Sequence, residues 1–97
     1  MKEYSSYIIK DYTKKKAKKL DLLVYPSDDP TKKIDVYSAR NGLFLARIGD
    51  VEYLDYPSYL EHDEDYAKER RRLYKIRHNK HRKKEGSKGW FADQLLW

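Results

Sequence analysis

Two histidines in the C-terminal half have the spacing of paired metal ligands. His78 and His81 lie three residues apart, which places both side chains on one face of a helix. Imidazole nitrogens are common ligands of zinc and other transition metals. The neighbouring side chains are cations, however, and like charge opposes the binding of a divalent ion: Arg77, Lys80, Arg82 and Lys83. We therefore expect no metal site and no cofactor.

A second arrangement with catalytic potential is a group of acids at Asp50, Glu52 and Asp55. Such a cluster can hold a metal in a nuclease, but acids in loops are more often solvated. The string His78-Asn79-Lys80-His81 has the residue types of strand-strand-helix nucleases, yet the hairpin that frames their metal is missing. The sequence also lacks a glycine-rich phosphate loop, a nucleophile elbow and a Ser-His-Asp order. We predict that the protein is not an enzyme and binds no small-molecule substrate.

The composition limits the size and class of the fold. A chain of 97 residues forms one small domain, in which ten tyrosines and two tryptophans must supply much of the packing. The absence of cysteine excludes disulfides and thiolate metal sites. No apolar run approaches the roughly 18 residues that a membrane span needs, and the first residues do not have the pattern of a secretory signal. We expect a soluble protein made in a reducing compartment.

Charge is segregated along the chain. Residues 1–26 carry seven lysines against three acids, residues 27–67 carry four bases against ten acids, and residues 68–97 carry eleven bases against three acids. An acidic middle between two basic ends can pair with itself, with a second copy, or with different partners at each end. The net charge of +6 is compatible with all three arrangements.

Short runs of branched and aromatic residues predict a small antiparallel sheet. Residues 20–25 form the first strand and end at a turn rich in proline and aspartate. Residues 33–39 and 43–48 flank Asn41-Gly42, a dipeptide that favours the two-residue type I′ turn of a hairpin. Residues 51–54 are a candidate fourth strand. The predicted fold class is α+β, with three or four strands followed by helices.

A long basic helix is predicted over residues 63–84. This stretch contains no proline or glycine, begins with three acids and continues with bases, as the helix dipole favours. Residues 1–19 are rich in lysine and lack a periodic apolar face, so we predict an extended arm there and a single domain over residues 20–97. The arm and the helix supply the predicted basic surface: Lys14, Lys15, Lys16, Lys18, Lys19, Arg70, Arg71, Arg72, Lys75, Arg77, Lys80, Arg82, Lys83 and Lys84.

This basic surface has two interpretations. Lysine and arginine can neutralise phosphates and give nonspecific contact with nucleic acid, or they can face acids on another protein. The bases occupy every side of the predicted helix, whereas proteins that read a DNA groove concentrate them on one side. We favour an acidic protein surface, and nonspecific nucleic-acid binding is the alternative.

A short aromatic segment at residues 89–97 follows a break that contains glycine and serine. Five large side chains make it apolar: Trp90, Phe91, Leu95, Leu96 and Trp97. The segment must dock somewhere, because so much exposed apolar surface is unfavourable. Either it folds back to complete a small core or it anchors in a partner, where aromatic side chains contribute much of the binding energy. We take these five residues as candidate partner-binding residues.

Five short motifs in the C-terminal half resemble those of a viral family. They are Tyr59-x-x-His62, Glu69-Arg70-Arg71-x-x-Tyr74, Arg77-His78-x-Lys80, Gly89-Trp90-Phe91 and Leu95-Leu96-Trp97. Together they resemble a small basic family of unknown function that large DNA viruses of algae and protists encode. The resemblance covers about residues 55–97 and implies a viral origin and a place among virion proteins. The family has no assigned catalytic residues, so the resemblance implies none here.

The expected function follows from these observations together. We expect a non-enzymatic virion structural protein, made in the host cytoplasm, that acts as a minor capsid or cement component and bridges larger capsid subunits. Its expected partners are capsid proteins or copies of itself. In the alternative, it is a nonspecific nucleic-acid-binding or packaging protein inside the particle.

Overall fold

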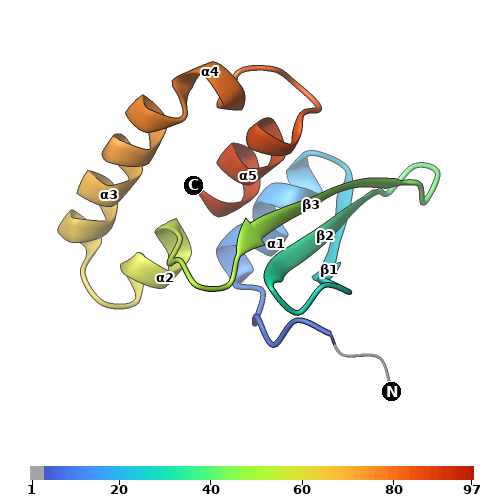
Figure 1. The fold of residues 1–97 in the computed structure, drawn as a ribbon, viewed down its shortest axis with the longest axis horizontal. Helices are drawn as coiled ribbons and strands as arrows, with labels where there is room; N and C mark the ends of the chain where they lie inside the picture. Colours follow the sequence, from blue (N-terminus) through green and yellow to red (C-terminus); the bar gives the residue numbers. More distant parts are fainter. Residues whose placement is uncertain (1–3) are drawn as a thin grey trace.

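The computed structural model describes residues 4–97, and over this range it contains one sheet and five helices (Figure 1). The strands are β1 (Leu22–Pro26), β2 (Lys32–Ser38) and β3 (Phe44–Asp50), in that order across an antiparallel sheet. The helices are α1 (Asp11–Lys19), α2 (Tyr56–Leu60), α3 (Glu64–Arg77), α4 (Asn79–Arg82) and α5 (Lys88–Leu96). The predicted α+β class is confirmed. None of these helices is long and apolar enough to cross a bilayer.

β2 is the central strand and pairs with both neighbours. Val36 lies opposite Val24 of β1 and Ala46 of β3. The predicted hairpin between β2 and β3 is present, but residues 39–43 connect the strands instead of a two-residue turn. In this connection only Gly42 has a positive φ, of 73°, whereas a type I′ turn needs positive φ at both central positions. Asn41 does not adopt that conformation, so the loop is longer than predicted.

The sheet ends after three strands, because residues 51–54 form a turn. The Asp50 carboxylate accepts a hydrogen bond from the Glu52 N–H at 3.0 Å, and the Asp50 carbonyl accepts one from the Tyr53 N–H at 3.1 Å. These local bonds satisfy the backbone that a fourth strand would have used for pairing. The turn leads directly to α2.

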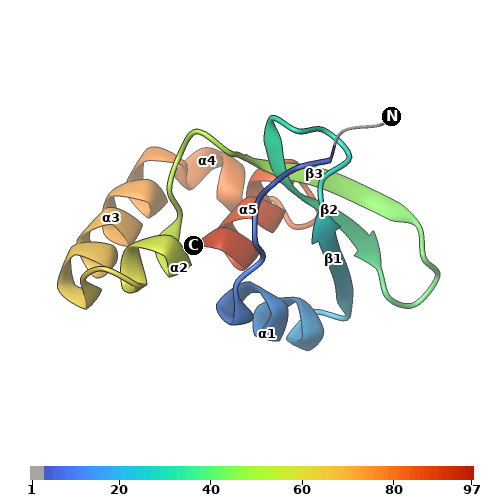
Figure 2. The same cartoon turned by 90° about the horizontal axis from the view of Figure 1, so that it is seen from below.

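The core lies between one face of the sheet and helices α1 and α5, which Figures 1 and 2 show on the same side. The buried apolar side chains of the sheet meet those of the helices: Ala17, Ile34, Val36, Ala46, Ile48, Phe91, Leu95 and Leu96. At Gly49 the backbone has a φ of 77°, and a Cβ atom there would lie 2.9 Å from Leu96 Cδ1. The absence of a side chain at Gly49 therefore lets α5 pack closely on β3.

The prediction of an extended arm over residues 1–19 is wrong for the part that forms α1; residues 1–3 lie outside the described residues. Thr13 and Ala17 lie four apart on one face of this helix and are both buried. Thr13 Oγ1 donates a hydrogen bond to the Leu95 carbonyl at 2.8 Å. A narrow stripe of small residues packs the helix against α5. Because small residues add little to the hydropathy pattern of a lysine-rich sequence, the amphipathic character of the helix is not visible in the sequence.

The predicted helix over residues 63–84 is interrupted. Asp63 caps α3 by accepting a hydrogen bond from the Tyr66 N–H at 3.1 Å, as a helix beginning at this aspartate requires. At His78 the backbone leaves the helical region, with φ −102° and ψ 18°, before the short helix α4. The Arg82 Nε–H donates to the Lys75 carbonyl at 3.1 Å, so a side chain satisfies an acceptor beside the break. The interruption redirects the chain towards the core.

The aromatic segment forms α5 and completes the molecule's own core. Ser87 caps this helix by accepting a hydrogen bond from the Trp90 N–H at 3.2 Å. Phe91, Leu95, Leu96 and Trp97 are buried, and Trp90 is half-buried. Assigning Phe91, Leu95, Leu96 and Trp97 to partner binding is therefore a prediction that the structure corrects, whereas for Trp90 it stays a prediction. The sheet and α1 alone provide too little apolar surface, so the segment folds back.

Candidate functional site

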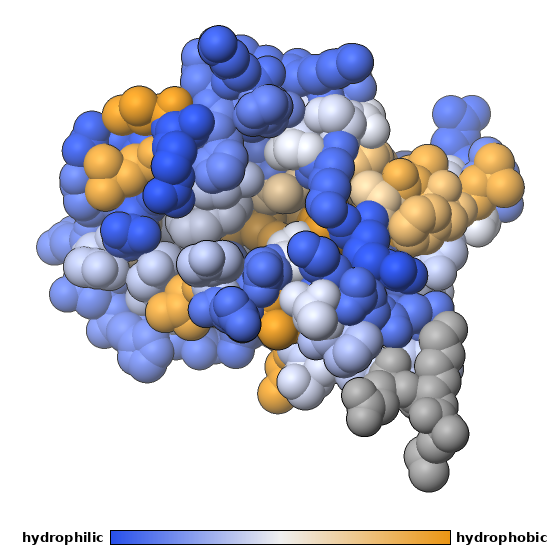
Figure 3. Space-filling view, viewed as in Figure 1, coloured by the Kyte–Doolittle hydropathy of each residue, from blue (hydrophilic) through white to orange (hydrophobic). Residues whose placement is uncertain are grey.

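The predicted cations lie on α1, α3, α4 and the turn after α4, and we call this set the basic helical surface. In Figure 3 most of the surface over α3 and α4 is hydrophilic, with a smaller hydrophobic patch among these residues. Nine of the fourteen side chains are exposed, and five are half-buried: Lys16, Arg70, Arg71, Lys75 and Arg82. The structure brings the two basic ends of the sequence to the same half of the molecule, because α1 and α3 both contact α5.

Few cations of this surface have a carboxylate partner. On α3, Arg72 pairs with Glu69 at 2.6 Å. Between helices, Lys75 Nζ lies 2.7 Å from Asp93 Oδ1, and the Asp93 side chain is almost fully buried. Over residues 4–97 no other ion pair involves the fourteen cations. Most of the positive charge on this surface is therefore left to solvent or to an external anion.

A groove of about 760 Å³ follows one face of α3 and reaches α4. We call it the basic groove, and its lining comprises Tyr56, Lys68, Arg71, Arg72, Lys75, Ile76, Asn79 and Arg82. The Arg71 guanidinium lies 4.8 Å from the centre of the Tyr56 ring, within the range of a cation–π contact. Spacings of three and four residues along α3 place these side chains on one helix face.

Helix α1 meets this region through two tyrosine rings. The rings of Tyr12 and Tyr56 have centroids 5.3 Å apart. Lys16 Nζ donates a hydrogen bond to Tyr12 Oη at 3.2 Å and lies over the same ring. Burial, together with the positive charges of Lys75 and Arg71, lowers the pKa of Lys16 to about 8. Half-buried cations of two helices are thus close enough to repel one another.

The sheet face that points away from α1 and α5 carries aromatic side chains. Tyr37 lies between Tyr25 and Phe44, with ring centroids 5.7 and 5.5 Å apart. Tyr25 and Phe44 are about half exposed, at 50% and 51%. We call Leu23, Tyr25, Tyr37 and Phe44 the open sheet face. Figure 3 shows hydrophobic residues gathered over the end of the β2–β3 hairpin, so apolar surface is exposed away from the basic groove as well as at Ile76 within it.

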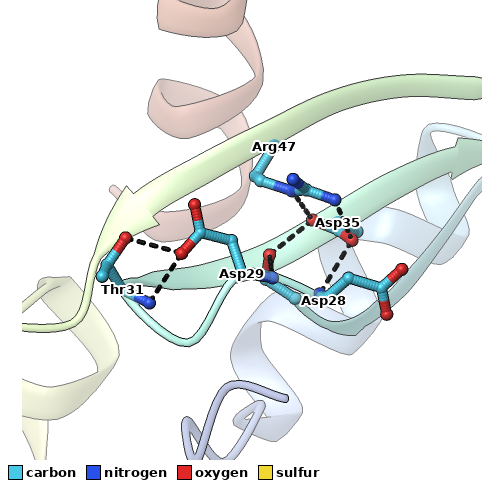
Figure 4. Close-up of polar contacts among 6 residues, drawn as sticks. Asp28, Asp29, Thr31, Asp35 and Arg47 are labelled. Atoms are coloured by element: carbon cyan, nitrogen blue, oxygen red, sulfur yellow. Dashed lines mark hydrogen bonds and ion pairs between the residues drawn. The ribbon is translucent and has the colours of Figure 1, made fainter. Parts of the chain in front are cut away.

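A buried carboxylate supports this face from within the sheet (Figure 4). Asp35 accepts hydrogen bonds from Arg47 Nε at 2.8 Å, Arg47 Nη2 at 3.2 Å and Ser27 Oγ at 2.7 Å. Burial raises the pKa of Asp35, but the hydrogen bonds from Arg47, the Asp28 N–H and Ser27 lower it more, so the net shift is downward. In the adjacent turn Asp29 accepts hydrogen bonds from the N–H and Oγ1 of Thr31 at 2.9 and 2.7 Å. Through these hydrogen bonds, Asp35 and Asp29 fix the conformation of the β1–β2 connection, so their role is structural.

The acids considered as metal ligands do not converge. Asp55 is buried and accepts hydrogen bonds from Lys33 Nζ at 2.9 Å and Tyr7 Oη at 2.6 Å. Asp50 and Glu52 belong to the turn after β3. In the part of the chain that the structure describes, no group of three or more histidines, cysteines or acids is placed to hold a metal ion.

One histidine of the pair is occupied by another contact. The His78 ring stacks on Tyr74 with centroids 4.3 Å apart. Burial, with the charges of Arg77 and His81, lowers the pKa of His78. The His78 ring packs against an aromatic ring at the interruption between α3 and α4.

Sequence reasoning missed several residues that shape these surfaces. Tyr12 and Tyr56 join α1 to the basic groove, and Asp93 anchors Lys75. Tyr12 could be identified only by predicting helix α1, and the run of lysines in this segment hides the helical pattern. Tyr25 and Tyr37 follow Leu23 and Asp35 at a spacing of two, which is the strand periodicity that predicts a common face. That pattern is present in the sequence, and it marks the open sheet face.

Comparisons with known proteins add no assignment. No protein-family model matches the chain, and neither the curated proteins nor the solved structures contain a significant match. The resemblance to a viral family stays a prediction.

Proposed function

We propose that the protein is a non-enzymatic structural protein that bridges two partners, as a minor capsid or cement component of a virion does. Two surfaces of different chemistry support the proposal. The basic helical surface lies on α1, α3 and α4, and the open sheet face lies on the other side of the sheet from α1 and α5. A protein with one such surface can bind one partner, whereas a protein with two such surfaces can bind two partners at once and hold them together.

The observation that carries the proposal is the unpaired positive charge. Of the cations on the basic helical surface, only Arg72 and Lys75 form ion pairs within residues 4–97. Charge of one sign on one side of a small protein accelerates association with an oppositely charged surface and orients the encounter. The open sheet face then supplies apolar area for a capsid protein or for a second copy.

This mechanism differs from the one that the sequence favours. The aromatic segment cannot be inserted into a partner while Phe91, Leu95 and Leu96 fill the core. The apolar contribution to binding is assigned instead to Tyr25, Tyr37 and Phe44 on the open sheet face.

Nonspecific nucleic-acid binding is the second candidate, and the basic groove favours it. Five cations line one elongated depression: Lys68, Arg71, Arg72, Lys75 and Arg82. Proteins that neutralise several phosphates release condensed counterions, so their affinity falls steeply with salt. Inside a particle the same surface would contact the packaged genome.

Chemical cross-linking of purified particles tests the bridging proposal. We expect lysine cross-links from α1 and α4 to one protein and photo-cross-links from position 25 or 44 to another. Recovery of the protein only outside particles, or cross-linked only to nucleic acid, would contradict the bridging role.

Two sets of substitutions separate the surfaces. Lys14→Gln with Lys15→Gln, Lys18→Gln and Lys19→Gln removes exposed charge from α1, and Tyr25→Ser with Phe44→Ser removes aromatic area from the sheet. Each set is expected to remove a different cross-linked partner. If the charge set alone abolished incorporation and a gel shift showed a log–log salt slope steeper than about −4, the nucleic-acid function would replace bridging.

A further inference from the structure

Three cations of α1 and α3 lie near the contact between Tyr12 of α1 and Tyr56 of α2, and only one of them has a carboxylate partner among the described residues. Lys16, Arg71 and Lys75 are all half-buried there, and we call them the cation corner. Two tyrosine rings connect the first two of them: Lys16 lies over the Tyr12 ring, Tyr12 packs against Tyr56, and Arg71 lies over the Tyr56 ring. Lys16 and Arg71 therefore approach one patch of aromatic surface from two helices, and Lys75 follows Arg71 four residues along α3 and lines the same groove.

One carboxylate forms an ion pair within this corner. Asp93 pairs with Lys75 at 2.7 Å, which leaves the charges of Lys16 and Arg71 uncompensated among the described residues. Lys16 uses one donor, to Tyr12 Oη at 3.2 Å, and has two more. The Arg71 guanidinium makes a cation–π contact and no hydrogen bond within residues 4–97. Donors of both side chains are free to reach an oxyanion.

The surroundings of Lys16 disfavour its charged form when no anion is bound. Burial lowers the pKa of Lys16 to about 8, and the charges of Lys75 and Arg71 act in the same direction, as does Lys19 on the same helix. Only Asp93, on α5, opposes them. Cations held this close to one another and partly out of water are stabilised when an anion joins them.

We infer that the cation corner of Lys16, Arg71 and Lys75 binds a phosphate group. The inference rests on the second candidate function, contact of the basic helical surface with nucleic acid, and names the chemistry that this surface recognises. An arginine fork and a lysine ammonium approaching from different helices match a tetrahedral oxyanion, which accepts hydrogen bonds in several directions. A carboxylate has fewer acceptor directions and one charge, against the two that the corner leaves uncompensated. The basic groove continues from Arg71 along α3, so a chain of phosphates has a path beyond the corner.

The phosphate can be free or part of a nucleic-acid backbone, and the two sources are distinguished by titration. The full chain is titrated with inorganic phosphate, with a single-stranded oligonucleotide and with polyglutamate, at constant ionic strength set with chloride. The signal is the NMR resonance of the Lys16 side chain. Saturable binding of phosphate, with the Lys16 pKa rising from about 8 towards its ordinary value, is the expected result. An oligonucleotide that binds at least about tenfold tighter per site identifies the backbone as the source; equal or weaker binding identifies free phosphate.

Matched variants locate the site. Lys16→Met and Arg71→Gln are each expected to weaken phosphate binding by about tenfold. Lys15→Met and Arg77→Gln remove the same charge from exposed neighbours on the same helices and are expected to change it by less than about twofold. Circular dichroism confirms that each variant is folded. A variant that unfolds is replaced by Lys16→Gln or Arg71→Lys.

Three results would overturn the inference. They are the absence of saturation by phosphate, an equal loss in the Lys15→Met control, and preferential binding of polyglutamate, which would make the corner a site for acidic protein. In each case cross-links from the basic helical surface to a partner protein would keep the bridging function intact. Loss of those cross-links with phosphate binding retained would instead remove the bridging function and leave the site.

Discussion

At the scale of single residues, Asp55 and Lys33 form the most buried ion pair among the described residues, with side-chain exposures of 0% and 4%. Tyr7 and Ser58 donate further hydrogen bonds to the same carboxylate. Burial raises the pKa of Asp55, but the charge of Lys33 and these hydrogen bonds lower it more, so the net pKa lies below the ordinary value. The pair joins the N-terminal segment, β2 and α2 at one point.

Replacing Asp55 tests how much this junction stabilises the fold. Asp55→Asn retains an acceptor for Ser58 but leaves the Lys33 charge buried and unpaired, so the free energy of unfolding should fall by about 3–5 kcal/mol. Urea denaturation at neutral pH measures it. Glu61→Gln is the control, because it breaks the exposed pair of Glu61 with Lys10 at 2.9 Å and should change stability by less than about 1 kcal/mol. Equal losses of unfolding free energy in the two variants would contradict the stabilising role of the buried Asp55–Lys33 pair.

The same carboxylate gives a pH dependence with a definite sign. The pKa of Asp55 is lower in the folded state than in the unfolded state, so its contribution is complete above the unfolded value of about 3.9. The contribution is lost as pH falls through the folded pKa. The difference in stability between the wild-type protein and Asp55→Asn should therefore shrink in acid, and denaturation curves at a series of pH values between neutrality and about pH 3 measure this. A stability difference between the two proteins that increased as the pH fell would contradict the lowered pKa of Asp55.

The charge of Lys16 has the opposite effect on stability, because it destabilises the fold, although stability again rises with pH. Its pKa is lowered to about 8, so the folded state disfavours the charged ammonium and stability should rise with pH from about 8 towards the unfolded value near 10.4. Lys16→Met keeps the aliphatic stem and removes the charge. Because the group is half solvated, we expect a gain of only about 1 kcal/mol at neutral pH, measured by urea denaturation. A loss of stability, or the same gain from Lys15→Met, would show that the corner is not strained.

At the scale of elements, the docking of α5 on β3 depends on the backbone of Gly49. A Cβ atom at this position would lie 2.9 Å from Leu96 Cδ1 and 2.8 Å from Lys33 Cδ, and the φ of 77° is unfavourable for a side chain. The close approach allows Leu95 and Leu96 to be buried. Helix α5, which completes the core, therefore packs at the position where β3 has no side chain.

A pair of glycine substitutions separates conformation from contact. Gly49→Ala should lower the free energy of unfolding by about 3 kcal/mol, because strain in φ adds to overpacking. Gly42→Ala has a similar φ of 73° but open space around it, and should lose only about 1 kcal/mol. Thermal and urea unfolding of both variants measure the difference. Equal effects would mean that α5 does not press on β3.

Part of this arrangement is readable from the sequence for a physical reason. The strands and the start of a helix at Asp63 depend on local preferences, so alternation, turn residues and acids in the first helical turn predict them. Helix α1 depends on burial of Thr13 and Ala17 against α5, which is a tertiary contact without a local apolar pattern. The same is true of the destination of Trp97, which stacks on Tyr74 with centroids 4.3 Å apart. The basic residues were predicted, but the corner they form depends on how two helices are placed.

At the scale of the whole molecule, positive charge is concentrated on the helices and only partly neutralised. Eleven bases against three acids in residues 68–97 fold next to the lysines of α1. Self-repulsion of such a surface opposes the compact state, and dissolved ions screen it within about 10 Å at 0.1 M salt. The stability of the fold should therefore respond to salt as a whole.

Thermal unfolding measures this response. Raising sodium chloride from about 10 mM to about 300 mM should increase Tm by a few degrees, because repulsion among cations outweighs the few surface ion pairs. The quadruple α1 variant with Lys14, Lys15, Lys18 and Lys19 changed to glutamine is the control and should show a smaller increase. A decrease of Tm with salt would mean that attractive pairs dominate.

The hydrogen bond between Thr13 and the Leu95 carbonyl joins residues 82 apart in the chain. Contacts of such long range form slowly, because a large loop must close before they contribute. During synthesis on the ribosome, α1 and the sheet emerge long before α5 and have nothing to cover their apolar side. A nascent chain that ends before Lys88 should thus stay unfolded, and a truncated translation product would be exposed to proteases instead of accumulating in competition with the finished protein.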